Sequence, residues 1–320
     1  MGFLKFAPYY SDRKKNMNIN NIEYHPVQPG CPVGYIRLDN IVDFDIAKTF
    51  DCGQCFRFEP VEGTRHEVEF AGVAHGKHIS LAIEGNTLYI YNTNPGEFLR
   101  LWRRYLGLDT DYSEIYRDIL SRSDNPALAR ALSLGRGIRI LRQDPWETVC
   151  SFIISQNNNI GRIKKILSTL SATLGERVVC RGMEEHGGGV AKYAFPTPRA
   201  IAAAGEEALR GLKVGFRAGY LADAAARVLG GELDFDYIES LPDTAACAAQ
   251  LKTIKGVGDK VAACILLFAF SRYDAFPVDV WIGRVLEKYF DGCRDTSCLG
   301  PYAGVAQQYL FYYERYKKGE

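Results

Sequence analysis

The sequence has no run of eighteen apolar residues, and its first residues lack the charged and then apolar pattern of a secretory signal peptide. These absences argue against a membrane protein and against export, so we expect a soluble, intracellular protein without a membrane partner. A strong excess of one charge is also missing, since 39 basic residues face 38 acidic ones and the formal net charge is +1. Composition alone therefore gives no sign of nucleic-acid binding, and any binding field must come from local clusters of basic residues.

The cysteines do not follow the pattern of a disulfide framework either. Nine cysteines are an odd number, and their spacing is irregular, which fits reduced thiols. Four of them could be imagined as zinc ligands, namely Cys52, Cys55, Cys293 and Cys298. The second pair is loosely spaced and no histidine accompanies it, so we expect no metal site.

What the chain does have is a change of hydrophobic period along its length. Residues 1–30 show no sustained period and are interpreted as an N-terminal extension. In residues 31–122, the runs 79–83 and 88–91 alternate on either side of a Glu-Gly-Asn turn, which predicts a twisted antiparallel β-sheet. Beyond Glu97 the period becomes helical and no convincing strand follows, and residues 123–320 are expected to form a larger all-α region, in two helical subdomains. The predicted fold class is α+β.

Helix start and stop signals are clear in the middle of the chain. Residues 144–147, Asp-Pro-Trp-Glu, combine an N-cap, a proline at the first helical position and an acidic third residue. The three asparagines at 157–159 interrupt that helix, and a second helix is predicted over 160–174 with Gly175 at its end. Residues 185–189 are interpreted as a flexible, glycine-rich loop.

A helical hairpin near residue 256 has the most chemical content. Gly256 and Gly258 bracket one valine between an alanine-rich helix and the apolar run 261–270, which predicts a tight turn into a new helix. Such a turn leaves bare N–H groups at the helix start, and a helix end of this kind holds a phosphate. We therefore predict that Gly256 and Gly258 form a phosphate-binding hairpin.

Two ionisable residues stand close to this hairpin. Lys260 lies in the first turn of the new helix and shares a face with Cys264, four residues further on. The positive end of the helix dipole and a dry pocket would both favour a neutral, nucleophilic amine at Lys260. Asp279 follows Pro-Val before another amphipathic helix, so it is predicted as the N-cap of that helix, near the lysine.

The glycine hairpin, its lysine and the aspartate of Pro-Val-Asp resemble the helix-hairpin-helix, Gly/Pro-rich loop, Asp (HhH-GPD) superfamily of DNA base-excision glycosylases. Within it, the chain looks most similar to 8-oxoguanine DNA glycosylases with AP-lyase activity, over about residues 40–312. The resemblance implies a bifunctional repair enzyme that flips out and excises 8-oxoguanine opposite cytosine. Lys260 would attack the sugar and form a Schiff base, Asp279 would stabilise positive charge on the sugar, and β-elimination would cleave the strand.

The resemblance also implies what this enzyme binds. Its partner would be double-stranded DNA that contains oxidised guanine, and the enzyme would act as a monomer. No cofactor would be required, although a structural cation could sit at the hairpin. Some relatives carry a four-cysteine iron–sulfur motif near the C-terminus, but only two cysteines follow the catalytic region here, so no iron–sulfur cluster is expected.

Two further motifs carry the resemblance on the side of the damaged base. Gly53 opens a Gly-Gln-Cys-Phe-Arg segment, in which the family's glycine carbonyl senses the N7 proton that 8-oxoguanine has and guanine lacks. Gln307 and Phe311 lie four apart after Gly-Pro-Tyr-Ala-Gly, which gives one amide for the base edge and one ring for stacking. With Cys264 on the other face, the flipped purine would lie between sulfur and phenyl.

Two motifs carry the resemblance on the side of the opposite cytosine. Asn157 opens Asn-Asn-Asn-Ile-Gly-Arg, where it would fill the space of the extruded nucleotide, and Arg162 would contact the cytosine. In Gly-Phe-Arg-Ala-Gly-Tyr, Phe216 is predicted as the wedge in a base step and Arg217 as a second reader of the cytosine.

Each of these motifs has a structural alternative when taken alone: a turn glycine, a capping asparagine or a core phenylalanine. Two alternatives also exist for the whole chain, namely an HhH glycosylase for another damaged base and a non-catalytic HhH DNA-binding protein. The chain departs from the family at one place, because Trp281 stands where eukaryotic members usually have a histidine, two places after the aspartate.

Overall fold

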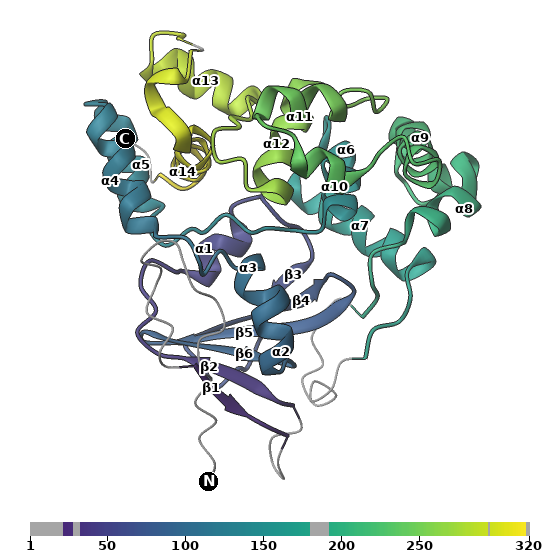
Figure 1. The fold of residues 1–320 in the computed structure, drawn as a ribbon, viewed down its shortest axis with the longest axis horizontal. Helices are drawn as coiled ribbons and strands as arrows, with labels where there is room; N and C mark the ends of the chain where they lie inside the picture. Colours follow the sequence, from purple (N-terminus) through teal and green to yellow (C-terminus); the bar gives the residue numbers. More distant parts are fainter. Residues whose placement is uncertain (1–21, 28–32, 180–191, 294, 318–320) are drawn as a thin grey trace.

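The computed structural model of the chain describes residues 22–27, 33–179, 192–293 and 295–317, and its N-terminal part is a six-stranded sheet (Figure 1). All neighbouring strands are antiparallel, in the order β1-β2-β6-β5-β4-β3. The strands are β1 (Ile22–His25), β2 (Tyr35–Leu38), β3 (Phe58–Pro60), β4 (Val68–Ala74), β5 (Lys77–Glu84) and β6 (Thr87–Tyr91). The predicted antiparallel sheet is therefore confirmed.

The alternation of the strands gives the sheet one apolar face. Ile36 in β2, Leu81 in β5 and Ile90 in β6 are fully buried. They belong to one core with apolar residues of α1 (Ile46–Asp51) and of a π-helical turn (Phe98–Trp102). Helical segments therefore cover this face, and α1 lies between the sheet and the larger helical part of the molecule (Figure 1).

The turn between β5 and β6 was predicted from the sequence, whereas strand β1 was not. The predicted Glu-Gly-Asn turn joins β5 to β6, where Glu84 pairs with Thr87 and Gly85 has a φ of +56°, which suits glycine. Strand β1 was not predicted and lies inside residues 1–30, because four half-buried residues show too little alternation to be recognised. At the other end, helical segments follow β6 from Pro95 onward, which agrees with the predicted change to a helical period beyond Glu97.

The remainder of the described chain is helical, apart from an isolated bridge between Arg177 and Tyr193. Two short helices flank the π-helical turn, α2 (Pro95–Glu97) and α3 (Arg103–Tyr105). The longer helices are α4 (Tyr112–Arg122), α5 (Pro126–Leu134), α6 (Pro145–Ser155), α7 (Ile160–Leu174), α8 (Pro198–Gly211), α9 (Ala218–Leu229), α10 (Phe235–Ser240), α11 (Thr244–Leu251), α12 (Asp259–Phe270), α13 (Val280–Tyr289) and α14 (Ala303–Tyr316). Two 3-10 turns, Gly215–Arg217 and Ser297–Tyr302, precede α9 and α14. The α+β class is confirmed.

The helices pack as two groups (Figure 1). In one group, α14 packs on α5 and α13, and α4 lies beside them. In the other, α12 packs on α6 and α11, and α7, α8 and α9 follow. Side chains of both groups contribute to one large apolar core.

The helix signals in the middle of the chain are confirmed. Asp144 caps α6 by accepting a hydrogen bond from the backbone N–H of Glu147 at 2.8 Å. Asn159 caps α7 in the same way, with the N–H of Arg162 at 2.9 Å. The loop predicted at 185–189 lies outside the described residues. None of the described helices is long and apolar enough to cross a membrane.

Candidate active site

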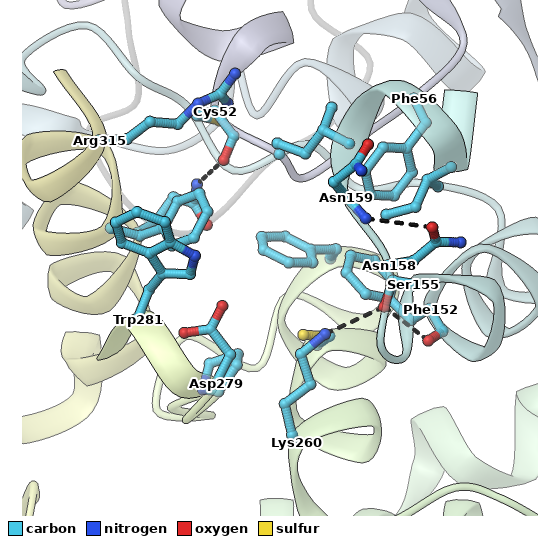
Figure 2. A pocket seen from close by; sticks show the side chains of 18 of the residues that line it. Cys52, Phe56, Phe152, Ser155, Asn158, Asn159, Lys260, Asp279, Trp281 and Arg315 are labelled. Atoms are coloured by element: carbon cyan, nitrogen blue, oxygen red, sulfur yellow. Dashed lines mark hydrogen bonds between the residues drawn. The ribbon is translucent and has the colours of Figure 1, made fainter. Parts of the chain in front are cut away.

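A cavity of about 450 Å³ opens where the loop after α1 meets the two helical groups. Its walls come from that loop, the α6–α7 turn, α12, the start of α13 and α14 (Figure 2). All six residues predicted to act on the damaged nucleotide line it, namely Gly53, Lys260, Cys264, Asp279, Gln307 and Phe311. The fold thus brings together residues that lie far apart in the sequence.

Lys260 points into the cavity from the first turn of α12 (Figure 2). Its Nζ donates a hydrogen bond to Ser155 Oγ at 3.1 Å and lies 5.3 Å from the centre of the Phe152 ring. Within the described ranges, this amine forms no ion pair with a carboxylate at 4.0 Å or less. The amine faces the space that a ligand would occupy.

The two hairpin glycines differ in backbone conformation and in the space around them. Gly256 has a φ of +82°, and a Cβ added there would lie 2.2 Å from the ring of Tyr220, so only glycine fits. Gly258 has an ordinary extended backbone, caps α12 without a side-chain acceptor, and a Cβ there would meet nothing. An uncapped helix start suits an anion, so phosphate binding by this hairpin stays a prediction that the geometry permits.

Cys264 lines the same cavity as the amine, and the carboxylate of Asp279 faces that cavity as well (Figure 2). Burial raises the pKa of the Cys264 thiol to about 11, although the charge of Lys260 lowers it. The thiol therefore stays protonated at neutral pH and does not compete as a nucleophile. Asp279 caps α13, as predicted, because its Oδ1 accepts from the N–H of Ile282 at 2.8 Å. The cap fixes this carboxylate at the cavity wall.

Gly53 forms the part of the wall that faces Phe311. Its φ of +81° lies in the left-handed region that favours glycine. A Cβ built on Gly53 would lie 3.4 Å from Phe311 and 3.4 Å from Ile160. Glycine thus keeps the space over the phenyl ring open and leaves the backbone exposed to a ligand there.

The side chain of Gln54 fixes the Gly53 loop. Gln54 is fully buried, and its Nε2 donates to the carbonyls of Thr49 at 2.9 Å and Arg139 at 2.8 Å. Its Oε1 accepts from the N–H of Leu141 at 2.8 Å. Because these bonds all go to backbone groups of other segments, the buried amide ties the loop to them.

Gln307 and Phe311 line the cavity from one face of α14. Gln307 is buried, and its Oε1 has no hydrogen-bond partner among the residues that the structure describes. An unpaired buried acceptor costs about 1–3 kcal/mol, so this amide is poised to accept a hydrogen bond from a ligand. The next residue, Gln308, donates to the carbonyl of Cys52 at 2.6 Å and ties α14 to the loop before Gly53.

The four residues predicted for the opposite cytosine do not line the cavity. Asn157 is exposed in the α6–α7 turn with a φ of +48°, which asparagine tolerates. Phe216 is 51% exposed and packs edge-on against the Tyr220 ring at 6.0 Å. A large exposed ring on a short turn is suited to insertion between bases.

Arg217 makes contacts that differ from those predicted for a cytosine reader. It is buried, and its guanidinium donates to the carbonyls of Gln156 at 2.9 Å and Asn157 at 3.1 Å. Burial lowers the pKa of Arg217, and the nearby charge of exposed Arg162 lowers it further. In this structure Arg217 holds the turn that carries Asn157, and its reading of cytosine stays a prediction.

Sequence reasoning assigned no role to Ser155 or Arg315 and left that of Trp281 open, yet all three line the cavity. Arg315 continues the stripe of Gln307 and Phe311 at four-residue spacing, so the helical period would have found it. The contact between Ser155 and Lys260 joins residues 105 positions apart, and no local pattern signals it.

No group of three or more histidine, cysteine or acidic side chains that could hold a metal occurs in the described part of the chain. Cys52 and Cys55 are buried whereas Cys293 and Cys298 are exposed, so the imagined zinc ligands are not brought together. Cofactor independence, a cation at the hairpin and the lack of an iron–sulfur cluster stay predictions.

Known sequence families match the two parts of the fold. Residues 38–149 match the N-terminal domain of 8-oxoguanine DNA glycosylase, and residues 150–296 match the HhH-GPD superfamily of base excision DNA repair proteins. The fold and the lysine–aspartate cavity therefore agree on the class: a base-excision DNA repair protein of the HhH-GPD type.

Individual relatives narrow this class. The N-glycosylase/DNA lyase of Saccharomyces cerevisiae is 32% identical over 58% of this chain, and the match spans only 50% of that relative. N-glycosylase/DNA lyase OGG1 of Arabidopsis thaliana is 30% identical over 82% of this chain and 75% of its own length. Clostridium acetobutylicum 8-oxoguanine glycosylase/lyase, in a crystal structure with double-stranded DNA containing cytosine opposite 8-oxoguanine, has 37% identity and a TM-score of 0.82, covering 93% of this chain and 99% of that one. The chain belongs to the 8-oxoguanine DNA glycosylase family.

Proposed function

We propose that this protein is a bifunctional DNA N-glycosylase and AP lyase that removes 8-oxoguanine paired with cytosine from double-stranded DNA. The observation that carries the proposal is that Lys260 and Asp279 share one cavity with Gly53, Gln307 and Phe311. Its volume of about 450 Å³ falls in the range of about 300–1,000 Å³ typical of small-molecule sites. The proposed nucleophile, the carboxylate and the proposed base-recognition groups thus line one cavity, whose volume supports binding of a flipped nucleotide.

In the proposed reaction, the lone pair of Lys260 Nζ forms a bond to C1′ of the sugar. The bond from C1′ to the base breaks, its electron pair leaves with the base, and the base takes up the proton that the attached amine loses. The carboxylate of Asp279 stabilises the positive charge that develops on the sugar. Opening of the sugar ring gives a Schiff base, and loss of a proton from C2′ then expels the 3′ phosphate by β-elimination.

Recognition of the oxidised base is proposed to rest on the other cavity residues. The carbonyl of Gly53 would accept the N7 proton of 8-oxoguanine, whereas the N7 acceptor of guanine would repel it. The buried amide of Gln307 would bind the Watson–Crick edge, and this fits its unpaired Oε1. Phe311 and the neutral thiol of Cys264 would cover the two faces of the base.

The exposed turns next to the cavity are proposed to contact the DNA duplex, which a monomer would bind. Asn157 would occupy the gap left by the flipped nucleotide, and Phe216 would wedge the base step. Arg162 is exposed and would read the orphaned cytosine, with Arg217 as the second reader. The hairpin of Gly256 and Gly258 would hold a phosphate.

Borohydride reduction under single-turnover conditions tests the proposal. With a duplex containing 8-oxoguanine opposite cytosine, the wild-type protein should release free 8-oxoguanine and be trapped covalently on the DNA. The Lys260→Gln variant should do neither, while Lys77→Gln, on the distant sheet, should behave as the wild type. Equal trapping of Lys260→Gln would refute the assignment of the nucleophile.

A panel of lesion-containing duplexes separates the alternatives in the same assay. Release of another damaged base, with 8-oxoguanine left in place, would show an HhH glycosylase of different specificity. Binding of the duplexes without release of any base would show a non-catalytic DNA-binding protein.

A further inference from the structure

Ser155 accepts a hydrogen bond from the amine of Lys260. It is the last residue of α6, and its Oγ donates to the carbonyl of Phe152 at 2.8 Å. The same oxygen accepts from Lys260 Nζ at 3.1 Å (Figure 2). Ser155 also lines the cavity, so this bond lies beside the space for the nucleotide.

The direction of these two bonds has a chemical consequence. A serine hydroxyl has one proton and two lone pairs. Because Ser155 gives its proton to the carbonyl of Phe152, it can offer Lys260 only a lone pair. A neutral amine has two N–H groups and one lone pair, so the bond to Ser155 uses an N–H and leaves the lone pair of Nζ available to the cavity.

We propose that Ser155 is a positioning residue, whose hydroxyl turns the lone pair of Lys260 toward the sugar of the flipped nucleotide. This role rests on the proposed lyase activity and deepens it. The hydroxyl contacts neither the sugar nor the base, and it acts only by orienting the attacking amine. A misdirected lone pair slows attack at C1′ without weakening the binding of DNA.

The surroundings of Ser155 are rigid enough for such a role. Phe152 is buried and stacks on Phe268, with ring centres 5.4 Å apart. On the other side, Arg217 bonds the carbonyls of the two residues that follow Ser155, and so fixes the end of α6. The hydroxyl is therefore held from both sides, and its position relative to α12 is set by the packing of α6 on that helix.

Two substitutions at Ser155 and one control test the proposal. Ser155→Ala removes the hydroxyl, and Ser155→Thr keeps it. Ser151→Ala is the matched control, because Ser151 is buried one turn earlier on α6 and does not line the cavity. For each protein, the single-turnover rate of 8-oxoguanine release, the rate of strand cleavage at a preformed abasic site, the Kd for the duplex and the Tm are measured.

We expect Ser155→Ala to slow both reactions about ten- to hundredfold, the range in which misplacement of a reacting group lies. The Kd and the Tm should stay at the wild-type values, and Ser155→Thr and Ser151→Ala should retain the wild-type rates. Wild-type rates for Ser155→Ala would overturn the positioning role. So would a Ser155→Thr variant as slow as Ser155→Ala, because the packing of α6 and not the hydroxyl would then be responsible.

The outcome is separate from that of the proposed function. If the wild-type protein is not trapped by borohydride, the proposed lyase activity is refuted. If the wild type is trapped and Lys260→Gln is not, the activity stands, and the rates of the Ser155 variants alone decide the positioning role.

Discussion

The cavity and the neighbouring turns that carry Asn157 and Phe216 are built in different ways. In the cavity, the side chains come from helices or from a loop fixed by buried amides such as Gln54 and Gln308. On the turns, the side chains of Asn157 and Phe216 are exposed, and what is fixed is the backbone, held by the guanidinium of Arg217.

The difference indicates a division of labour. Catalysis needs groups that are placed before the substrate arrives, and buried hydrogen bonds provide this. A surface that enters a duplex needs accessible side chains on a firm backbone. Changes in the cavity should therefore alter rates, and changes on the turns should alter affinity.

The largest effect in this comparison is expected at Asp279. Asp279→Asn should lower the single-turnover rate of base release about 10²–10³-fold, because the charge that stabilises the sugar is lost. Asparagine is as good an N-cap as aspartate, so the Tm and the Kd for the duplex should stay unchanged. A single-turnover rate of Asp279→Asn within about twofold of the wild-type rate would contradict a role of Asp279 in base release.

Gln307→Ala should separate base recognition from sugar chemistry. We expect release of 8-oxoguanine to fall about ten- to hundredfold, the effect of losing a buried hydrogen bond to the base. Cleavage at a preformed abasic site should keep its rate, because no base is present to be recognised. The Tm should not fall through loss of a hydrogen bond to Oε1 of Gln307, since this atom has no partner in the described structure. Equal slowing of both reactions would contradict this division.

Phe216→Ala tests the exposed turns, where we expect a change to alter affinity for DNA and not the rate. Loss of the wedge should raise the Kd for the lesion duplex about tenfold, in line with the free energy of stacking on a base. At saturating enzyme the rate of base release should be retained, and because the ring is 51% exposed the Tm should change little. A fall in the saturated rate with an unchanged Kd would place Phe216 in the catalytic step.

The smallest effect at neutral pH is expected from the ionisation of Cys264. Its pKa is raised from 9.0 to about 11, so between these pH values the folded protein keeps a proton that the unfolded chain loses. The contribution of this group to the free energy of unfolding is constant below pH 9 and falls as the pH rises, by at most about 3 kcal/mol. Denaturant titrations should show a shallower decline for Cys264→Ala; an identical decline would contradict the raised pKa.

Several cavity residues could be placed from the sequence because they sit in local patterns. Lys260 and Cys264 follow from a hairpin and a helical period, and Asp279 follows from a capping position. The resemblance to a family singled out Gly53, Gln307 and Phe311, and the four-residue spacing only places the last two on one face. These patterns fix which face a side chain occupies, and the resemblance to a family indicated that the faces meet.

The features that were missed depend on tertiary contacts or on very short elements. The bond from Lys260 to Ser155 and the burial of Arg217 against the α6–α7 turn join distant segments, so no local period reports them. Strand β1 is stabilised by pairing with β2 and not by its own sequence, and four residues leave no clear alternation.

Mapping of the reduced covalent adduct tests the central claim most directly. The wild-type protein would be trapped with borohydride on a duplex containing 8-oxoguanine opposite cytosine, digested, and analysed by mass spectrometry. The account predicts that the deoxyribose remnant is attached to Nζ of Lys260. Attachment to another lysine or to the terminal amine, with Lys260 unmodified, would contradict it.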